Sequence, residues 1–309
     1  MAMKMYLIFL LAFSALCAKT RTQIAMGTFV SITLDEKQEL FEKGFEIFKE
    51  VDASLTSYKE GGDVYELNKH HFVKLRSYTY EALALSKHYY KESHGFFDIT
   101  VGSITKSYYH FGENREFIPY PALLKKANVG FSDLRFNMNF AFIKKGIKVD
   151  LGGMGKGFGV QKVSELFLKK GVKKALIAAS GDIRCIGVCE VDLQDPFSQN
   201  TLFRLKTKKS VTGITTSGNY RRFVASKKCN HLINPYLKQS AQTLASTTLI
   251  STQSSADLDA YATAVSVMPL EMAKMFLDSK KIAYIFITNA KEMIISQNIH
   301  DYVTLIQTK

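Results

Sequence analysis

Proline is scarce in this sequence, with 5 residues in 309, and glycine is not enriched at 19. A chain with this composition and an ordinary charged fraction of 22% is neither disordered nor fibrous. Internal repeats, low-complexity tracts and linker-like stretches are also missing. With 46% hydrophobic residues the chain can form a substantial core, and its length fits one large or two medium domains.

Cysteine is scarce as well. Beyond the N-terminal region only Cys185, Cys189 and Cys229 remain. An odd and sparse set of this kind is not a disulfide framework. Cys185 and Cys189 flank a strand-like stretch, and no second cysteine or histidine pair completes a zinc site. We interpret all three as ordinary core or surface residues.

Acidic residues are outnumbered, which gives a formal net charge of +13 and a pI near 9.4. Such a charge is compatible with nucleic acid, an anionic ligand or an anionic membrane surface as a partner. However, no basic run is longer than three residues, and no nucleic-acid recognition motif is recognisable. A dispersed positive surface is the simpler interpretation, and no nucleic-acid partner is expected.

The N-terminus carries an apolar run, Tyr6 to Leu16, which follows Lys4 and precedes Cys17 and Ala18. The run is shorter than the roughly 20 residues that a membrane-spanning helix needs. A basic start, a short apolar segment and small residues after it predict a secretory signal peptide over residues 1–18 and an exported, periplasmic protein. A second possibility stays open, in which Cys17 is lipidated and anchors the protein to the inner membrane. Leu16 argues against it, because a small residue usually precedes such a cysteine.

The hydrophobic pattern predicts an α+β fold. An alternating, β-branched run predicts a strand at 28–34, and apolar residues spaced by three and four predict an amphipathic helix over 37–55. Strands and helices alternate irregularly and several hairpins are expected, so mixed or antiparallel sheets with flanking helices are favoured over a parallel sheet. Further helices are predicted at 80–93, 157–170, 255–268 and 269–279, strands at 175–179, 201–213, 283–288 and 302–308, and a hairpin at 140–151 with its turn at 144–146.

Glycines gather in the stretch from Val149 to Gly159, at positions 152, 153, 155, 157 and 159. They allow the backbone to approach a ligand closely, and the N-terminus of the helix that follows offers free N–H groups suited to a phosphate. Lys156 adds a positive charge. The spacing matches neither a Walker P-loop nor the dinucleotide-binding fingerprint. A tight strand-to-helix turn therefore explains the stretch equally well.

Asp259 and Thr263 lie one turn apart on the same face of a predicted helix. A carboxylate and a hydroxyl in this arrangement are hard oxygen ligands suited to Mg²⁺. The alternative is that Asp257 or Asp259 caps the helix and that Thr263 bonds to its own backbone. The residues alone favour this alternative.

Two further stretches are rich in polar residues. One is Ser180 to Arg184, directly after a predicted strand, and the other combines Thr215 to Tyr220 with His231 to Pro235. Each suits either a polar ligand or an ordinary turn. A single histidine is more often structural than catalytic, so chemistry by itself assigns no role to His231.

Taken in order, eight short stretches resemble the ApbE family of flavin transferases, the FAD:protein FMN transferases. A single stretch is weak evidence, whereas eight in the family's order are specific. They extend over most of residues 22–309, the expected transferase domain. The stretches are Met26-Gly-Thr28; Ser57-Tyr58 with Leu67-Asn68; Gly95-Phe-Phe-Asp-Ile-Thr100; Asp150-Leu-Gly-Gly-Met-Gly-Lys-Gly157; Gly181-Asp-Ile-Arg184; Thr216-Ser-Gly-Asn-Tyr220; His231-Leu-Ile-Asn-Pro235; and Asp259-Ala-Tyr-Ala-Thr-Ala264.

The resemblance implies a single compact α+β unit with FAD in a cleft between two subdomains. The reaction it implies needs Mg²⁺, moves FMN from FAD to a Thr or Ser hydroxyl in the flavinylation motif of an exported redox protein, and releases AMP. Mg²⁺ would be held by the Gly153 carbonyl, the Asp259 carboxylate and the Thr263 hydroxyl, and His231 would be the catalytic base. The implied FAD-binding residues are Met26, Tyr58, Phe96, Phe97, Asp98, Asp150, Lys156 and Ile233.

The sequence departs from the family pattern in three places. Asn234 stands where an acid is usual, Tyr236 to Lys238 replaces a Thr-Gly turn, and Ser180 replaces the first glycine of Gly-Gly-Asp. These changes are compatible with FAD and metal binding but bear on acceptor recognition and turnover. Two other functions stay open. One is an FAD pyrophosphatase or flavin-binding protein of the same fold, and the other is a basic binding protein of the cell envelope without chemistry.

Overall fold

The structure, a computed structural model, describes residues 18–35, 38–220 and 222–307. The predicted signal peptide, including Cys17, lies outside the described residues except for Ala18. Within these ranges, no helix has both the length and the apolar character that crossing a membrane requires.

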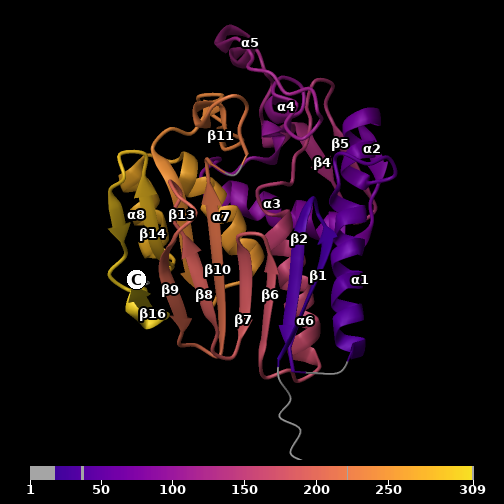
Figure 1. Cartoon of the computed structure of the whole chain (residues 1–309). Helices are drawn as coiled ribbons and strands as arrows, with labels where there is room; N and C mark the ends of the chain where they lie inside the picture. The colour runs from indigo at the N-terminus through magenta and orange to yellow at the C-terminus, as the bar shows by residue number, and fades with distance from the viewer. Residues whose placement is uncertain (1–17, 36–37, 221, 308–309) are drawn as a thin grey trace, which may run out of the picture.

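An eight-stranded sheet forms the centre of the molecule (Figure 1), and neighbouring strands in it run antiparallel throughout. Its strands come from both ends of the chain, so the N-terminal and C-terminal parts share one sheet. In spatial order they are β1 (Lys19–Ala25), β2 (Thr28–Leu34), β6 (Ala175–Ala179), β7 (Asp182–Ile186), β10 (Val211–Gly218), β13 (Leu244–Ser251), β14 (Ala283–Thr288) and β15 (Met293–Ile295).

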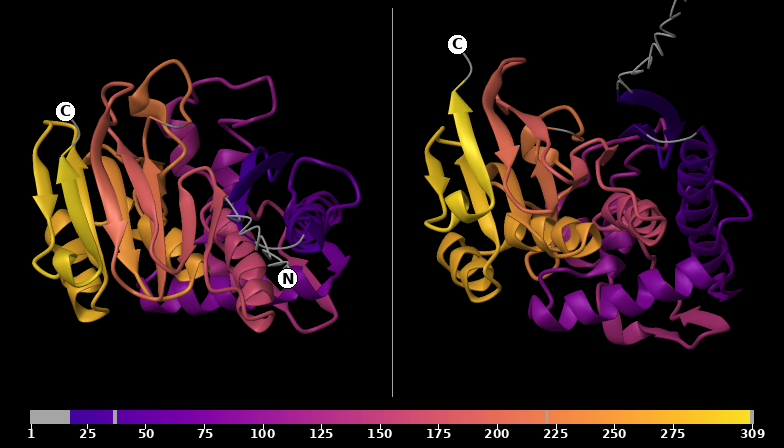
Figure 2. Two further views of the ribbon diagram at one scale, coloured as in Figure 1. Left: turned by 60° about the horizontal axis from the view of Figure 1, so that its bottom comes forward. Right: turned by 90° about the horizontal axis from the view of Figure 1, so that it is seen from below.

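Smaller antiparallel sheets and the helices surround this centre. Figure 2 shows the long helices gathered on one side of the large sheet. The small sheets are β3 (Phe72–Lys74), β5 (Phe140–Ile143) and β4 (Leu134–Phe136); β16 (Val303–Gln307), β9 (Thr201–Thr207) and β8 (Glu190–Gln194); and β11 (Ile233–Asn234) with β12 (Gln239–Ser240). The helices are α1 (Gln38–Leu55), α2 (Asp63–His70), α3 (Ser77–Glu92), α4 (Gly102–Thr105), α5 (Pro121–Lys125), α6 (Gly155–Lys169), α7 (Ser255–Val267) and α8 (Leu270–Ser279).

Apolar side chains fill both faces of the sheet. On the helical side, Ile32 of β2 and Ile177 of β6 pack in one cluster with Phe48 of α1 and Phe167 of α6, and all four are fully buried. Each such side chain stabilises the fold by about 1.5–3 kcal/mol. The opposite face packs against the β16-β9-β8 sheet, where Cys185 is buried. The three cysteines of the described chain are free thiols, as the sequence indicated.

Helices α6 and α7 approach each other closely because glycine stands at their contact. A Cβ atom at Gly157 would lie 2.2 Å from the Ser255 carbonyl oxygen and 2.6 Å from the Cβ of Asp259. Only a residue without a side chain fits in this position. The packing brings the glycine-rich stretch of the sequence against the helix that carries Asp259 and Thr263.

The predicted α+β class is confirmed, and most predicted helices and strands match within a few residues. The hairpin predicted at 140–151 is wrong, because the segment after its turn pairs with side chains and loops. Val149 exchanges hydrogen bonds of 2.7 and 2.8 Å with the Asn68 side chain, and the Asp150 N–H donates to the Ile99 carbonyl at 2.8 Å. The single strand predicted at 201–213 is in fact β9 and β10, because the chain leaves one sheet and enters another between them.

Candidate active site

Lys156 lies in the first turn of α6 between two buried carboxylates. Its Nζ is 2.7 Å from Asp182 Oδ2 and 3.5 Å from Asp259 Oδ2, and both acids are at most 2% exposed. Burial works against the charged form of Lys156, but the two carboxylates outweigh it and hold the pKa of this lysine above its ordinary value. Burial and the neighbouring Asp259 raise the pKa of Asp182. The Ser180–Arg184 stretch thus contributes an acid to the site through Asp182.

The capping alternative for Asp257 and Asp259 is wrong, because Ser254 caps α7 by accepting the Asp257 N–H at 3.0 Å. Asp257 instead accepts the Tyr89 hydroxyl at 2.7 Å, while Asp259 Oδ2 accepts the Gly157 N–H of α6 at 2.9 Å. The Asp259 carboxylate therefore lies at the N-terminus of α6, where a negative charge is favoured.

Thr263 also bonds outside its own helix. Its hydroxyl donates to the Gly153 carbonyl at 3.0 Å, and a Cβ at Gly153 would lie 3.0 Å from that hydroxyl oxygen. The glycine-rich turn is thus held against α7 at Asp259 and at Thr263, one helical turn apart. The three residues predicted to bind metal lie along a single contact between two elements.

The chemistry of these three groups fits Mg²⁺. They offer a carbonyl, a hydroxyl and a carboxylate, and Mg²⁺ takes oxygen ligands at 2.0–2.1 Å in an octahedron, whose edges are about 3 Å. The 3.0 Å between Thr263 Oγ1 and the Gly153 oxygen equals such an edge. No hydrogen bond among the described residues engages Asp259 Oδ1. The described part of the chain contains no group of three acidic, histidine or cysteine side chains placed to hold a metal. The metal role stays a prediction.

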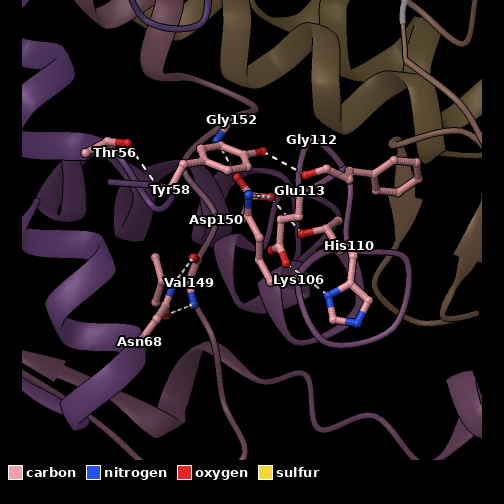
Figure 3. Close-up of polar contacts among 12 residues, drawn as sticks. Thr56, Tyr58, Asn68, Lys106, His110, Gly112, Glu113, Val149, Asp150 and Gly152 are labelled. Carbon is pink, nitrogen blue, oxygen red and sulfur yellow. Dashed lines mark hydrogen bonds and ion pairs between the residues drawn. The ribbon is translucent and has the colours of Figure 1, made fainter. Parts of the chain in front are cut away.

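Asp150 and Tyr58 lie close together across Lys106 (Figure 3). The Asp150 carboxylate accepts the Gly152 N–H at 2.9 Å and the Thr105 hydroxyl at 2.7 Å, and lies 4.0 Å from Lys106 Nζ. Burial raises the pKa of Asp150, but Lys106 and these hydrogen bonds outweigh it, so the pKa lies below its usual value.

Beside Tyr58 lies a cavity of about 630 Å³ with polar and basic walls. This volume is within the range of small-molecule sites. Its lining residues come from the segment before α2, from α2 itself, and from the loops around residues 106–115 and 148. They include Tyr58, Lys69, Lys106, Arg115 and Lys148.

Met26 and Phe97 lie against the glycine-rich stretch at residues 149–159. Met26 and Gly27 form the two-residue turn between β1 and β2, with φ of 54° and 69°. The Met26 side chain lies against α6, where a Cβ at Gly159 would come within 2.8 Å of its sulfur. Phe97 is buried and stands 3.4 Å from where a Gly153 Cβ would be.

His231 is neutral near pH 7. Its Nδ1 lies 3.0 Å from the Arg222 carbonyl oxygen, which only accepts, so Nδ1 carries the proton and Nε2 keeps a lone pair. Burial, together with the positive charges of Arg222 and Lys156, lowers the pKa of His231 to about 4, although Asp150 acts in the opposite direction. The histidine thus feels the charges of two other predicted site residues.

Three predicted FAD-binding residues pack elsewhere through their side chains. Phe96 makes an edge contact with Tyr236, with ring centres 5.1 Å apart. Asp98 is buried and caps the short 3₁₀ helix Ile99–Val101, accepting both the N–H and the hydroxyl of Thr100. Ile233 belongs to a separate cluster around Phe111. Their roles toward FAD stay predictions.

At the departures from the family pattern, the chain forms hydrogen-bonded or left-handed turns. Asn234 accepts the N–H groups of Tyr236 and Leu237 through its side-chain oxygen, as a carboxylate would, and donates to the Val267 carbonyl at 2.8 Å. Lys238 and Ser180 adopt left-handed backbone conformations, with φ of 55° and 57°, where glycine is favoured. Both positions thus adopt a backbone conformation that a glycine would favour.

Sequence reasoning missed Lys106 and Arg222. The structure places Arg222 near Tyr58, with its guanidinium carbon 5.8 Å from the ring centre, and its carbonyl orients His231. Lys106 follows α4 in an irregular segment of aromatic residues, and Arg222 lies in a loop. Neither occupies a periodic pattern or a motif, so no signal in the sequence distinguishes them from surface cations.

Comparison with known proteins agrees with this architecture. The model of the ApbE family matches residues 26–286, so the chain belongs to the ApbE family, and the resemblance inferred from the sequence is confirmed. A curated relative from Buchnera aphidicola, named FAD:protein FMN transferase, is 26% identical over 76% of this chain and 74% of its own length. A relative of the same name from Treponema pallidum is 22% identical over 94% of this chain and 90% of its own length. These curated relatives are therefore transferases.

Solved structures share the fold. The ApbE protein of Thermotoga maritima superimposes with a TM-score of 0.84 at 20% identity, covering 93% of this chain and 100% of the other. The flavin transferase ApbE of Vibrio cholerae gives a TM-score of 0.80 at 20% identity, with the same coverage. The α+β architecture of this chain is thus that of the ApbE structures.

Proposed function

We propose that this chain transfers the FMN moiety of FAD to a threonine or serine hydroxyl of an acceptor protein and releases AMP. Family membership and the names of the relatives support flavin transfer. One structural observation carries the proposal furthest: the Gly153 carbonyl, the Thr263 hydroxyl and the Asp259 carboxylate line a single contact between α6 and α7. That contact lies beside the glycine-rich turn suited to a phosphate.

The reaction we propose is an in-line displacement at phosphorus. The acceptor hydroxyl oxygen forms a bond to the FMN phosphorus of FAD, the pyrophosphate P–O bond breaks, and AMP leaves with the bonding electrons. The hydroxyl proton passes to Nε2 of His231, whose Nδ1 is held by the Arg222 carbonyl. Lys156 and the N–H groups at the start of α6 offer positive charge to the phosphates.

Gly153, Asp259 and Thr263 are the groups that would hold Mg²⁺. When bound, this ion neutralises the charge that develops on the phosphate oxygens. Asp259 is oriented for such a role by the Gly157 N–H and by Lys156, which both approach its Oδ2. The FAD would occupy a cleft lined by Met26, Tyr58, Phe97 and Asp150, with Phe96, Asp98 and Ile233 at its margin.

Localisation belongs to the same proposal. An apolar N-terminal run with a basic start supports export to the periplasm, either as a soluble protein or through a lipidated Cys17. The acceptors would then be exported redox proteins with a Thr- or Ser-containing flavinylation motif. Fractionation of cells that express wild-type or Cys17→Ser protein separates the two forms, because only a lipoprotein would move from the membrane to the soluble fraction on substitution.

The decisive experiment compares two neighbouring acids of α7. Purified protein is incubated with FAD, Mg²⁺ and co-expressed exported proteins, and covalent FMN is detected by mass spectrometry. We expect Asp259→Asn to lower transfer at least about 100-fold, because it removes the carboxylate proposed to hold Mg²⁺. Asp257→Asn, which can still accept the Tyr89 hydroxyl, should keep near wild-type activity.

The alternatives predict different products. AMP release that is indifferent to any acceptor would identify an FAD pyrophosphatase, and an absence of flavin binding would favour an envelope binding protein without chemistry. Undiminished transfer by Asp259→Asn would show that the metal assignment is wrong even if the transferase activity stands.

A further inference from the structure

The ammonium group of Lys106 is buried without a hydrogen-bond acceptor. Lys106 directly follows α4 and is 3% exposed, and its Nζ makes no hydrogen bond with any residue that the structure describes. An ammonium group that loses its water and gains no acceptor is unfavourable in a protein interior. Packing alone therefore does not account for a lysine here.

Two groups of the candidate FAD site offset part of this cost. Nζ lies 3.3 Å from the centre of the Tyr58 ring, within the range of a cation–π interaction. It also lies 4.0 Å from Asp150 Oδ2, close enough for electrostatic attraction. One charge thus acts on an aromatic ring and a carboxylate that come from distant parts of the sequence.

The Tyr58 ring is held from further directions. Its hydroxyl donates to the Phe111 carbonyl at 3.1 Å, and a Cβ at Gly112 would lie 3.2 Å from the ring. Even so, Tyr58 is 41% exposed and borders the 630 Å³ cavity. A ring that is fixed on its protein side and open to a cavity is a preorganised surface for stacking, because ordering it on binding costs little.

We propose that Lys106 is a positioning residue for FAD: from behind, its ammonium fixes the Tyr58 ring as a stacking surface for an aromatic ring of the dinucleotide and holds the Asp150 carboxylate in place. This inference rests on the proposed function, because it requires an FAD site beside Tyr58 and Asp150. Lys106 borders the same cavity, but in this role it acts on FAD through Tyr58 and Asp150.

The role has a pH signature through Asp150. The charged groups that act on this carboxylate are Lys106 and Arg222, and Asp150 in turn acts on His231. Burial raises the pKa of Asp150, and Lys106 is the largest of the opposing influences. Without Lys106 the pKa of Asp150 therefore rises, so FAD affinity should fall more on acidification in Lys106→Met than in wild type.

The test is the dissociation constant of FAD, followed by flavin fluorescence, for Lys106→Met and Lys106→Arg. We expect about tenfold weaker binding for Lys106→Met at pH 8, because the Tyr58 ring must then be ordered on binding, and a further loss at pH 5.5. Turnover at saturating FAD should change little, and Lys106→Arg should restore most of the affinity. Circular dichroism checks that each variant is folded.

Lys209→Met is the matched control. Lys209 also lies over a tyrosine ring, 5.9 Å from the centre of Tyr302, but it is exposed and does not line the cavity. Its substitution removes the same charge and should leave FAD affinity within about twofold of wild type, because an exposed charge far from the site contributes little.

A double-mutant cycle with Tyr58→Leu separates positioning from direct contact. If Lys106 acts through Tyr58, Lys106→Met should weaken binding much less in the Tyr58→Leu background. Equal loss in both backgrounds would mean that Lys106 contacts FAD directly, and unchanged affinity in Lys106→Met would mean that it has no such role. Either result overturns the inference while the wild type still binds and transfers flavin. A wild type that binds no FAD would overturn the proposed function as well.

Discussion

Single residues of the candidate site combine structural and chemical demands. Asp98 was predicted to bind FAD, and in the structure its carboxylate caps a 3₁₀ turn from a buried position. Burial raises the pKa of Asp98 to about 6, although the Thr100 hydrogen bonds act in the opposite direction. Because the pKa of Asp98 is raised in the folded protein, the free energy of unfolding depends on pH.

The sign of that dependence follows from linkage. The folded-state pKa of about 6 lies above the ordinary value of 3.8 for this side chain, so the folded state binds the proton more tightly. The contribution of Asp98 to the free energy of unfolding is complete below about pH 4. About 3 kcal/mol of it is lost as the pH rises to about 6. Asp98→Asn should remove this loss, so its free energy of unfolding relative to wild type should increase between pH 4.5 and 7.5.

Urea unfolding at several pH values measures this difference. Asp278→Asn, at an exposed position on α8, controls for the loss of a carboxylate elsewhere. If the difference in unfolding free energy between Asp98→Asn and wild type stayed constant across this pH range, ionisation of Asp98 would not destabilise the fold.

His231 gives a prediction about rate. With its pKa lowered to about 4, chiefly by burial, it is neutral and able to accept a proton throughout the range from pH 5.5 to 8. The single-turnover rate of FMN transfer should therefore show no loss from this group on acidification to pH 5.5. His231→Gln should lower that rate about 100-fold or more while FAD affinity stays near wild type. Normal transfer by His231→Gln would remove the histidine from the mechanism.

At the scale of elements, the contact between α6 and α7 depends on which glycines face it. Gly157→Ala would place a methyl group 2.2 Å from the Ser255 carbonyl, and backbone must move to relieve the clash. We expect a loss of about 1–3 kcal/mol in unfolding free energy, together with weakened Mg²⁺-dependent activity, because Asp259 lies beside the same glycine.

Gly155→Ala, in the same turn of α6, is the control. Its Cβ would stand 3.9 Å from Leu55 and Met26, an ordinary contact. Since alanine at this first helical position meets no close contact, this variant should be about as stable as wild type. Equal behaviour of the two variants in thermal unfolding would contradict the packing described for α6 and α7.

Elements were predictable from sequence where one face of a regular pattern is buried. α1 and β2 fulfil this condition, and both were found at their predicted positions. The segment after residue 146 alternates like a strand, but Asn68 supplies its hydrogen bonds, and no local pattern reveals a side-chain partner 81 residues away. β1 was missed because six of its seven residues are not buried, which leaves no apolar alternation to detect.

The residues of the candidate site likewise divide into those that belong to a sequence pattern and those that do not. The glycine turn, Asp259 and Thr263 are recognisable because they occur in motifs, and the structure brings them together. Lys106 becomes visible only when the fold places it behind Tyr58. A contact between residues 48 positions apart, both in irregular segments, has no signature in one sequence.

At the scale of the whole molecule, the large sheet joins residues 19–34 to residues 283–295. Because strands from both ends share one sheet with the middle of the chain, we expect a single cooperative thermal transition. Far-ultraviolet circular dichroism and tyrosine fluorescence, which no tryptophan obscures, should give coincident midpoints. Addition of FAD with Mg²⁺ should raise both midpoints equally. Two separated transitions would show that the chain contains independent units.

The direction of β1 sets how far the start of the described chain lies from the Met26-Gly27 turn. The chain enters the fold at the lower end of this strand in Figure 1, and the Met26-Gly27 turn lies at the upper end, beside α6. Seven extended residues span about 23 Å. In the proposed lipoprotein form, the point of attachment ahead of Lys19 would thus lie about one strand length from the Met26-Gly27 turn of the candidate site.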